Sequence, residues 1–219
     1  MNFFYYGIIA NILFLSSCSS TKPSPLPKLG NYDLVYYNKN GIQYIDTVYP
    51  KIPTFNYLNE DSIWVSNENF KNKIWIVEFF FANCPTICPL MNQQLKKLVA
   101  ETSPMKSHLQ FLSFTIDPIN DSPSKLRAFK IRHGIRSKNW AFLTGDEAKT
   151  HVLGIKNFLT FAGKDEESAG GYAHSGSFSL VDKEGYVRGV YAVTNFDLTI
   201  NQSEYDRLKK DIINLIKYK

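Results

Sequence analysis

A continuous apolar run in the first half of the chain, KIWIVEFFFA at residues 73–82, constrains the fold more than any other segment. The run is rich in β-branched and aromatic residues, which is typical of a central strand buried on both faces of a sheet. Such a strand needs a large apolar core around it. The 219-residue chain is 44% hydrophobic and 15% aromatic, which is enough for one packed domain of moderate size.

The segments around this run predict the layers of the domain. Residues 42–66 alternate apolar and polar side chains around Asn59-Glu60-Asp61, which predicts short antiparallel strands. Apolar periodicity and turn residues predict helices over 88–102, 122–134, 146–159 and 203–219, strands over 108–117 and 140–145, and a hairpin over 176–193. An early parallel crossover followed by late antiparallel strands indicates a mixed α/β sandwich.

The N-terminus carries the pattern of an export leader. FFYYGIIANILFL (3–15) is too short to cross a bilayer as a folded helix, and it ends in Leu15-Ser16-Ser17-Cys18. This ending resembles the lipobox of bacterial lipoproteins, in which the signal is cut before a cysteine that carries the lipid. The resemblance implies a signal peptide over 1–17, a lipid anchor on Cys18 with a flexible tether over 18–45, and an exported domain over 46–219.

We therefore expect the protein at the extracytoplasmic face of a bacterial cell envelope, lipid-anchored to the membrane. Because no Lys or Arg precedes the apolar run, an uncleaved N-terminal anchor with an incidental cysteine is the alternative. The formal net charge is +5, but the lysines are scattered along the chain. This distribution indicates a mildly basic, solvated surface and no nucleic-acid partner.

The remaining two cysteines are expected to have a reactive or metal-binding role rather than to form a structural disulfide. If Cys18 carries a lipid, the exported domain keeps only Cys84 and Cys88, too few for a disulfide scaffold. We expect Cys84 in the loop after the central strand and Cys88 in the first turn of a helix, where free N–H groups and the helix dipole stabilise a thiolate. The i, i+4 spacing allows a disulfide, a redox-active dithiol or a metal clamp, and CPTIC alone does not choose among them.

A metal would need at least one further ligand, and His174 is the candidate. It lies in GGYAHSGSFSL, immediately before the predicted hairpin, and Gly170, Gly171 and Gly176 around it let the loop fold back. The other histidines are expected at the surface or the edge of the core: His108, His133 and His151.

Four blocks of the chain together resemble the Sco/SenC family: CPTICP, TIDPINDSPSKLRAF, NWAFLTG and AHSGSFSLVDKEG, in the family's order over roughly residues 50–216. Members are membrane-anchored copper proteins that help to assemble the dinuclear copper centre of cytochrome c oxidase. The resemblance implies an α/β fold with a thioredoxin-like mixed sheet flanked by helices and an N-terminal β-hairpin extension.

The resemblance also assigns roles to residues. Cys84 and Cys88 match the family's copper-binding and redox-active cysteines, and His174 matches its distal histidine ligand. Asp117 and Asp121 match an acidic pair, for which we expect a supporting role around the ligands or ordinary turn and helix-start chemistry. Two thiolates and one imidazole suit Cu(I) and make Cu(II) accessible, whereas zinc normally takes a fourth ligand.

Two functions follow from the resemblance. One is a metallochaperone that delivers copper to the copper-centre subunit of cytochrome c oxidase, with a thiol reductant or another copper carrier as further partners. The other is a thiol–disulfide oxidoreductase that keeps the cysteines of the recipient site reduced. A peroxidase that uses a reactive cysteine is a distant third.

Overall fold

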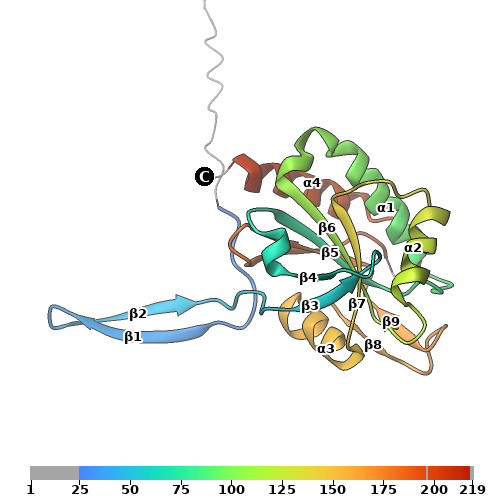
Figure 1. Cartoon of the computed structure of the whole chain (residues 1–219). Helices are drawn as coiled ribbons and strands as arrows, with labels where there is room; N and C mark the ends of the chain where they lie inside the picture. Colours follow the sequence, from blue (N-terminus) through green and yellow to red (C-terminus); the bar gives the residue numbers. More distant parts are fainter. Residues whose placement is uncertain (1–24, 196, 218–219) are drawn as a thin grey trace, which may run out of the picture.

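The computed structural model describes residues 25–195 and 197–217, and its main sheet has seven strands in the order β11-β10-β5-β6-β7-β3-β4 (Figure 1). At its centre β5 (Ile74–Phe80) runs parallel to β6 (Leu109–Thr115), and β6 runs parallel to β7 (Trp140–Thr144). The remaining pairings are antiparallel. The mixed sheet with flanking helices confirms the predicted fold class.

The other elements agree with the sequence pattern within a few residues. The remaining strands of the main sheet are β3 (Asn56–Asn59), β4 (Trp64–Ser66), β10 (Ser177–Val181) and β11 (Val187–Ala192). The helices are α1 (Cys88–Glu101), α2 (Pro123–Arg132), α3 (Glu147–Val152) with a π-helical continuation over Leu153–Asn157, and α4 (Gln202–Lys217). Short 3-10 helices cover Asn67–Phe70 and Ser103–His108, and a small sheet pairs β8 (Ala162–Lys164) with β9 (Tyr172–His174).

The core forms on both faces of β5, all of whose residues are buried. Phe79 packs against Phe114 and Phe158 on one face, while Phe80 packs against Phe129 and Phe142 on the other. The helices α1, α2 and α4 cover the Phe80 face, and α3 lies on the opposite side of the sheet (Figure 1). The amphipathic stripe of α4 is core packing, as predicted, because Tyr205, Leu208, Ile212 and Leu215 are buried.

Two hairpins precede the central strand. One is β3–β4, which turns at the predicted Asn59–Asp61 segment. The other joins β1 (Asp33–Lys39) to β2 (Ile42–Val48) in a separate ribbon that projects from the domain, with every residue exposed (Figure 1).

The β1–β2 ribbon confirms the expected N-terminal β-hairpin extension, although it occupies residues that the sequence analysis placed mainly in the flexible tether. The reason is local: Asn40 and Gly41 both have positive φ (55° and 80°), as a type I′ hairpin turn requires, and alternating apolar residues flank them. The division of the chain into leader, tether and domain stays a prediction, since residues 1–17 and Cys18 lie outside the described residues. No helix in the described part of the chain is long and apolar enough to cross a membrane.

Candidate metal centre

The two cysteines lie where the sequence predicts. β5 ends at Phe80, and the chain turns so that the Cys84 N–H donates to the Phe81 carbonyl at 3.2 Å. Cys88 is the first residue of α1 and is only 3% exposed, whereas Cys84 is half-buried in the loop. Pro89 follows Cys88 in the first turn, where the N–H that proline lacks is not needed. Both thiols are free.

His174 reaches the cysteines from the small β8–β9 sheet. Two glycines make this approach possible. Gly170 has φ +90°, and a Cβ there would lie 2.8 Å from the Phe81 ring. A Cβ on Gly176 would lie 2.7 Å from Ile87 Cδ1, so the start of β10 can meet the start of α1 only without a side chain at this position.

The three donor atoms converge. Cys88 Sγ lies 2.8 Å from His174 Nε2, and Cys84 Sγ lies 3.9 Å from the same nitrogen. All three donors lie within 4.8 Å of one another. Around a trigonal ion with metal–donor bonds of about 2.0–2.3 Å, the donors are about 3.5–4 Å apart. One ion therefore fits among these three atoms after small side-chain shifts.

The two thiols differ in acidity. A hydrogen bond from Cys88 is the largest cause of the lowered pKa of the Cys84 thiol, which falls to about 3. Burial, and then the neighbouring Cys84, raise the pKa of Cys88 above its ordinary value. Cys84 therefore carries the negative charge while Cys88 keeps a proton. A metal ion that binds both sulfurs must displace that proton.

The imidazole is oriented for ligation. His174 Nδ1 lies 3.3 Å from the Ser175 carbonyl, and a hydrogen bond from Nδ1–H to it selects the tautomer with a lone pair on Nε2. Two sulfurs and this nitrogen make a soft donor set that fits copper. In the described residues no fourth His, Cys, Asp or Glu joins the group, so the usual closed tetrahedral zinc site is not formed.

Asp121 is buried beside the site and ties two loops together. Its Oδ2 accepts hydrogen bonds from Ala82 N–H at 2.9 Å and from the Thr115 hydroxyl at 2.6 Å, so it joins the loop after β5 to the loop after β6. Burial raises its pKa. The structure thus places Asp121 behind the cysteine loop, and its supporting role stays a prediction.

Asp117 is linked to the histidine segment through Tyr172, which the sequence analysis did not single out. The Tyr172 hydroxyl donates to Glu147 at 2.7 Å and lies 3.3 Å from Asp117 Oδ1. The Tyr172 ring packs on Phe81, whose ring meets His174 edge-on. The only sequence signal for Tyr172 is its position two residues before His174.

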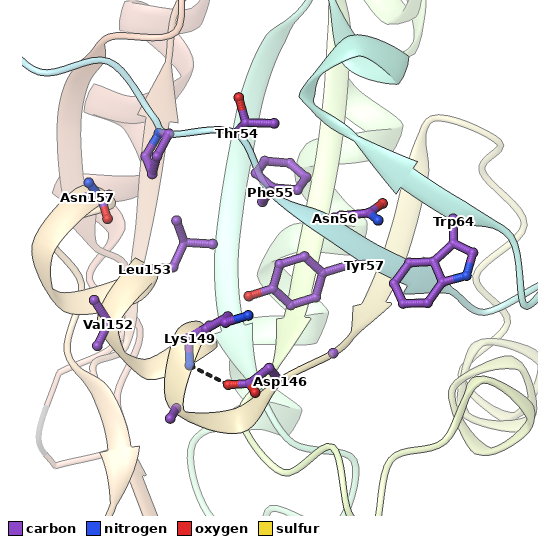
Figure 2. A pocket seen from close by; sticks show the side chains of 13 residues that line it. Thr54, Phe55, Asn56, Tyr57, Trp64, Asp146, Lys149, Val152, Leu153 and Asn157 are labelled. Atoms are coloured by element: carbon purple, nitrogen blue, oxygen red, sulfur yellow. Dashed lines mark hydrogen bonds between the residues drawn. The ribbon is translucent and has the colours of Figure 1, made fainter.

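The other three histidines and a cavity between β3 and α3 lie apart from the three donor atoms. His108, His133 and His151 do not join the cluster. A cavity of about 770 Å³ opens between β3 and α3, lined by residues such as Phe55, Tyr57 and Leu153 (Figure 2). At its edge the Asp146 side chain caps α3 by accepting from Lys149 N–H. None of the predicted site residues lines this cavity.

With this geometry established, comparisons with known proteins become informative. The family model described as SCO1/SenC matches residues 46–203. The SCO1 protein homolog of Bacillus subtilis (strain 168) is 30% identical over 207 residues, which cover 94% of each chain. The chain therefore belongs to the SCO1/SenC family.

Solved structures agree with this assignment. A SCO1/SenC family lipoprotein from Bacillus anthracis str. Ames is 30% identical, with a TM-score of 0.66 over 76% of this chain and 95% of its own. BsSco, a Sco-family cytochrome c oxidase assembly protein with a disulfide switch, is also 30% identical, with a TM-score of 0.65 over 77% and 95%. Sco proteins from Bradyrhizobium japonicum, yeast and Arabidopsis thaliana have been solved with copper bound and share the fold at 17–23% identity.

The acidity of Cys84 is testable by alkylation. In the reduced, metal-free protein we expect iodoacetamide to modify Cys84 at pH 5 and to leave Cys88 unmodified, because only the thiolate reacts. The substitution Cys88→Ala removes the main hydrogen bond to Cys84 and is expected to slow the modification of Cys84 at pH 5 by about tenfold. Mass spectrometry of peptides after timed quenching measures both rates. A Cys84 that reacts at pH 5 no faster than free cysteine would contradict the charge assignment.

Asp121→Ala tests the link between the two loops. The substitution leaves the Ala82 N–H and the Thr115 hydroxyl without their acceptor. We expect it to lower the free energy of unfolding by about 2–3 kcal/mol. Urea unfolding measures the loss, and the fully exposed Asp197→Ala serves as the control. Equal stability of the two variants would show that Asp121 does not hold the cysteine loop.

Proposed function

We propose that this protein binds copper through Cys84, Cys88 and His174 and delivers it to the dinuclear copper site of cytochrome c oxidase. The observation that carries the proposal is the convergence of two sulfurs and one imidazole nitrogen within 4.8 Å at the carboxyl end of β5. Membership of a family that includes a cytochrome c oxidase assembly protein, and relatives solved with copper, support it.

The donor geometry suits a carrier. Cys84 is half-buried and Cys88 is almost fully buried, so an ion held by both would be shielded on one side and reachable on the other. Three soft ligands leave room for an incoming ligand from a recipient protein. In this proposal the partner is the copper-centre subunit of the oxidase, and copper is cargo.

A second candidate function uses the same sulfurs without a metal. An acidic thiol next to a buried one is the arrangement of a thiol–disulfide oxidoreductase: the first attacks and the second resolves the mixed disulfide. The protein would then keep the cysteines of the recipient site reduced. The disulfide switch of BsSco supports this candidate.

We further propose that the protein acts at the extracytoplasmic face of the cell envelope, attached by a lipid on Cys18. The lipobox-like LSSC sequence supports this location, as does the Bacillus anthracis lipoprotein relative.

His174→Ala separates the two functions. Without the imidazole, copper affinity is expected to fall by more than the roughly 10–100-fold typical of losing an outer-shell partner, while dithiol exchange survives. Anaerobic titration of the reduced domain with Cu(I) and Cu(II), with spectra and a free-thiol count, measures both. His108→Ala is the matched control, since His108 lies outside the donor group. Stoichiometric copper binding by His174→Ala would refute the ligand assignment.

Cys18→Ser tests the anchor. In a bacterial host, the wild-type protein is expected to incorporate a clickable fatty acid and to sediment with membranes, and the variant is expected to lose the label. An unlabelled wild-type protein that still sediments with membranes would favour the uncleaved anchor instead.

A further inference from the structure

The β1–β2 ribbon has one face without a charged side chain. Cross-strand partners in an antiparallel ribbon lie on the same face, and successive pairs alternate between the two faces. Just beyond the strands the rings of Tyr32 and Tyr49 meet at 5.5 Å and continue one of these faces. We call this set the neutral face: Tyr32, Leu34, Tyr36, Asn38, Gln43, Ile45, Thr47 and Tyr49. The set contains no Asp, Glu, Lys, Arg or His.

The opposite face of the ribbon, the charged face, mixes two acids and a lysine with its apolar side chains: Asp33, Val35, Tyr37, Lys39, Ile42, Tyr44, Asp46 and Val48. Here the rings of Tyr37 and Tyr44 stack on each other at 5.5 Å. On the neutral face Tyr36 and Ile45 are partners, and each is 63% exposed. The ribbon projects from the domain with all its residues exposed, so the domain covers neither face (Figure 1).

The composition of the neutral face fits a membrane surface. A two-stranded ribbon with nothing packed against it is only marginally stable in water. Apolar side chains gathered on one exposed face mark a surface that binds another body. Tyrosine is enriched at the boundary between lipid and water, where its ring lies at the level of the headgroups and its hydroxyl reaches water. Three tyrosines with a leucine and an isoleucine between them match that boundary.

Both ends of the ribbon are fixed to the turn between β10 and β11. Where the chain enters the ribbon, Leu29 N–H donates to the Val187 carbonyl at 2.8 Å. Where the chain leaves it, Ile52 N–H donates to the Gly185 carbonyl, also at 2.8 Å. The root of the ribbon is therefore part of the folded domain.

The chain before the ribbon is short enough to keep this root near a bilayer. Cys18, the proposed site of the lipid, lies eight residues before Leu26, whose carbonyl accepts a hydrogen bond from Arg188 of β11. Eight extended residues span at most about 26–29 Å. Each strand of the ribbon has seven residues, so the ribbon is about 23 Å long. A lipid on Cys18 therefore keeps the root close enough for the ribbon to reach the bilayer surface.

A second copy of the chain fits the neutral face less well. A ribbon about 23 Å long and about 10 Å wide has a footprint of about 230 Å². A stable protein–protein interface covers about 800 Å² on each partner. A bilayer sets no such minimum, because a lipid on Cys18 already holds the ribbon at a high effective concentration beside it.

We propose that the neutral face of the β1–β2 ribbon lies on the membrane surface. Leu34 and Ile45 enter the upper part of the acyl chains, and the tyrosine rings lie among the headgroups. This inference rests on the proposed lipid anchor at Cys18. The lipid supplies attachment, and the ribbon supplies an orientation that a flexible tether alone does not.

The orientation concerns the metal centre. Val181, at the end of β10, pairs with Trp75, near the start of β5, so the β10–β11 turn lies at the amino end of β5. Cys84 and Cys88 follow the carboxyl end of the same strand. The root of the ribbon and the metal centre therefore lie at opposite edges of the sheet. A ribbon bound to the membrane keeps the donor atoms at the edge far from the point of attachment.

Two adjacent tyrosines on opposite faces provide the test. A photoreactive benzoylphenylalanine replaces either Tyr36, on the neutral face, or Tyr37, on the charged face, in the full chain produced in a bacterial host. Illumination of isolated membranes joins the benzophenone to the C–H bonds of whatever lies beside it, and mass spectrometry of peptides identifies the adduct. We expect phospholipid adducts at position 36 and about tenfold fewer at position 37.

The outcomes separate this inference from the proposed anchor. Equal lipid adducts at the two positions, or adducts at position 36 with a second copy or another protein in place of lipid, would overturn the inference. A clickable fatty acid on Cys18 is read in the same sample. A labelled protein without lipid adducts overturns the inference alone, whereas an unlabelled protein overturns the anchor as well.

Discussion

The site depends on the burial of β5 on both faces of a mixed sheet. Because β5 and β6 are parallel neighbours, the loops that follow them leave the sheet at the same edge. One loop carries Cys84 and the other carries Asp121, and the hydrogen bond from Ala82 N–H to Asp121 joins them. A strand with a solvated face would move with its loop, whereas a fully buried one holds the sulfurs at a fixed place.

Carboxylates in this core differ in how fully they are paired. Glu60 is neutralised by a lysine, and Asp121 accepts two hydrogen bonds that hold the cysteine loop. Glu78 has one bond to a hydroxyl and one bare oxygen. An isolated charge in the interior is expensive, so burial raises the pKa of Glu78, the least well paired of the three, to about 7.

The disulfide, the reduced dithiol and the metal-bound form are three states of the same pair of cysteines, Cys84 and Cys88. Cys84 is the acidic, accessible sulfur, Cys88 is the buried sulfur that keeps a proton, and His174 Nε2 faces both. Loss of the Cys88 proton allows the pair either to form a disulfide or to bind a metal ion through both sulfurs. The proton therefore separates the reduced dithiol from the other two states.

The sequence by itself determined the central strand, the helices and the position of both cysteines, because these depend on local periodicity and on turn residues. It also marked His174 and the acidic pair by their resemblance to a family. The resemblance also implied the N-terminal β-hairpin, although the sequence analysis placed its residues mainly in the tether, and nothing in the sequence revealed the contact of Tyr172 with Asp117 and Glu147. Only the tertiary structure brought His174 to sulfurs that lie 86 and 90 residues away in the chain. Sequence spacing carries no information about such a distance, since it is set by how the β8–β9 sheet packs against the ends of the central strands.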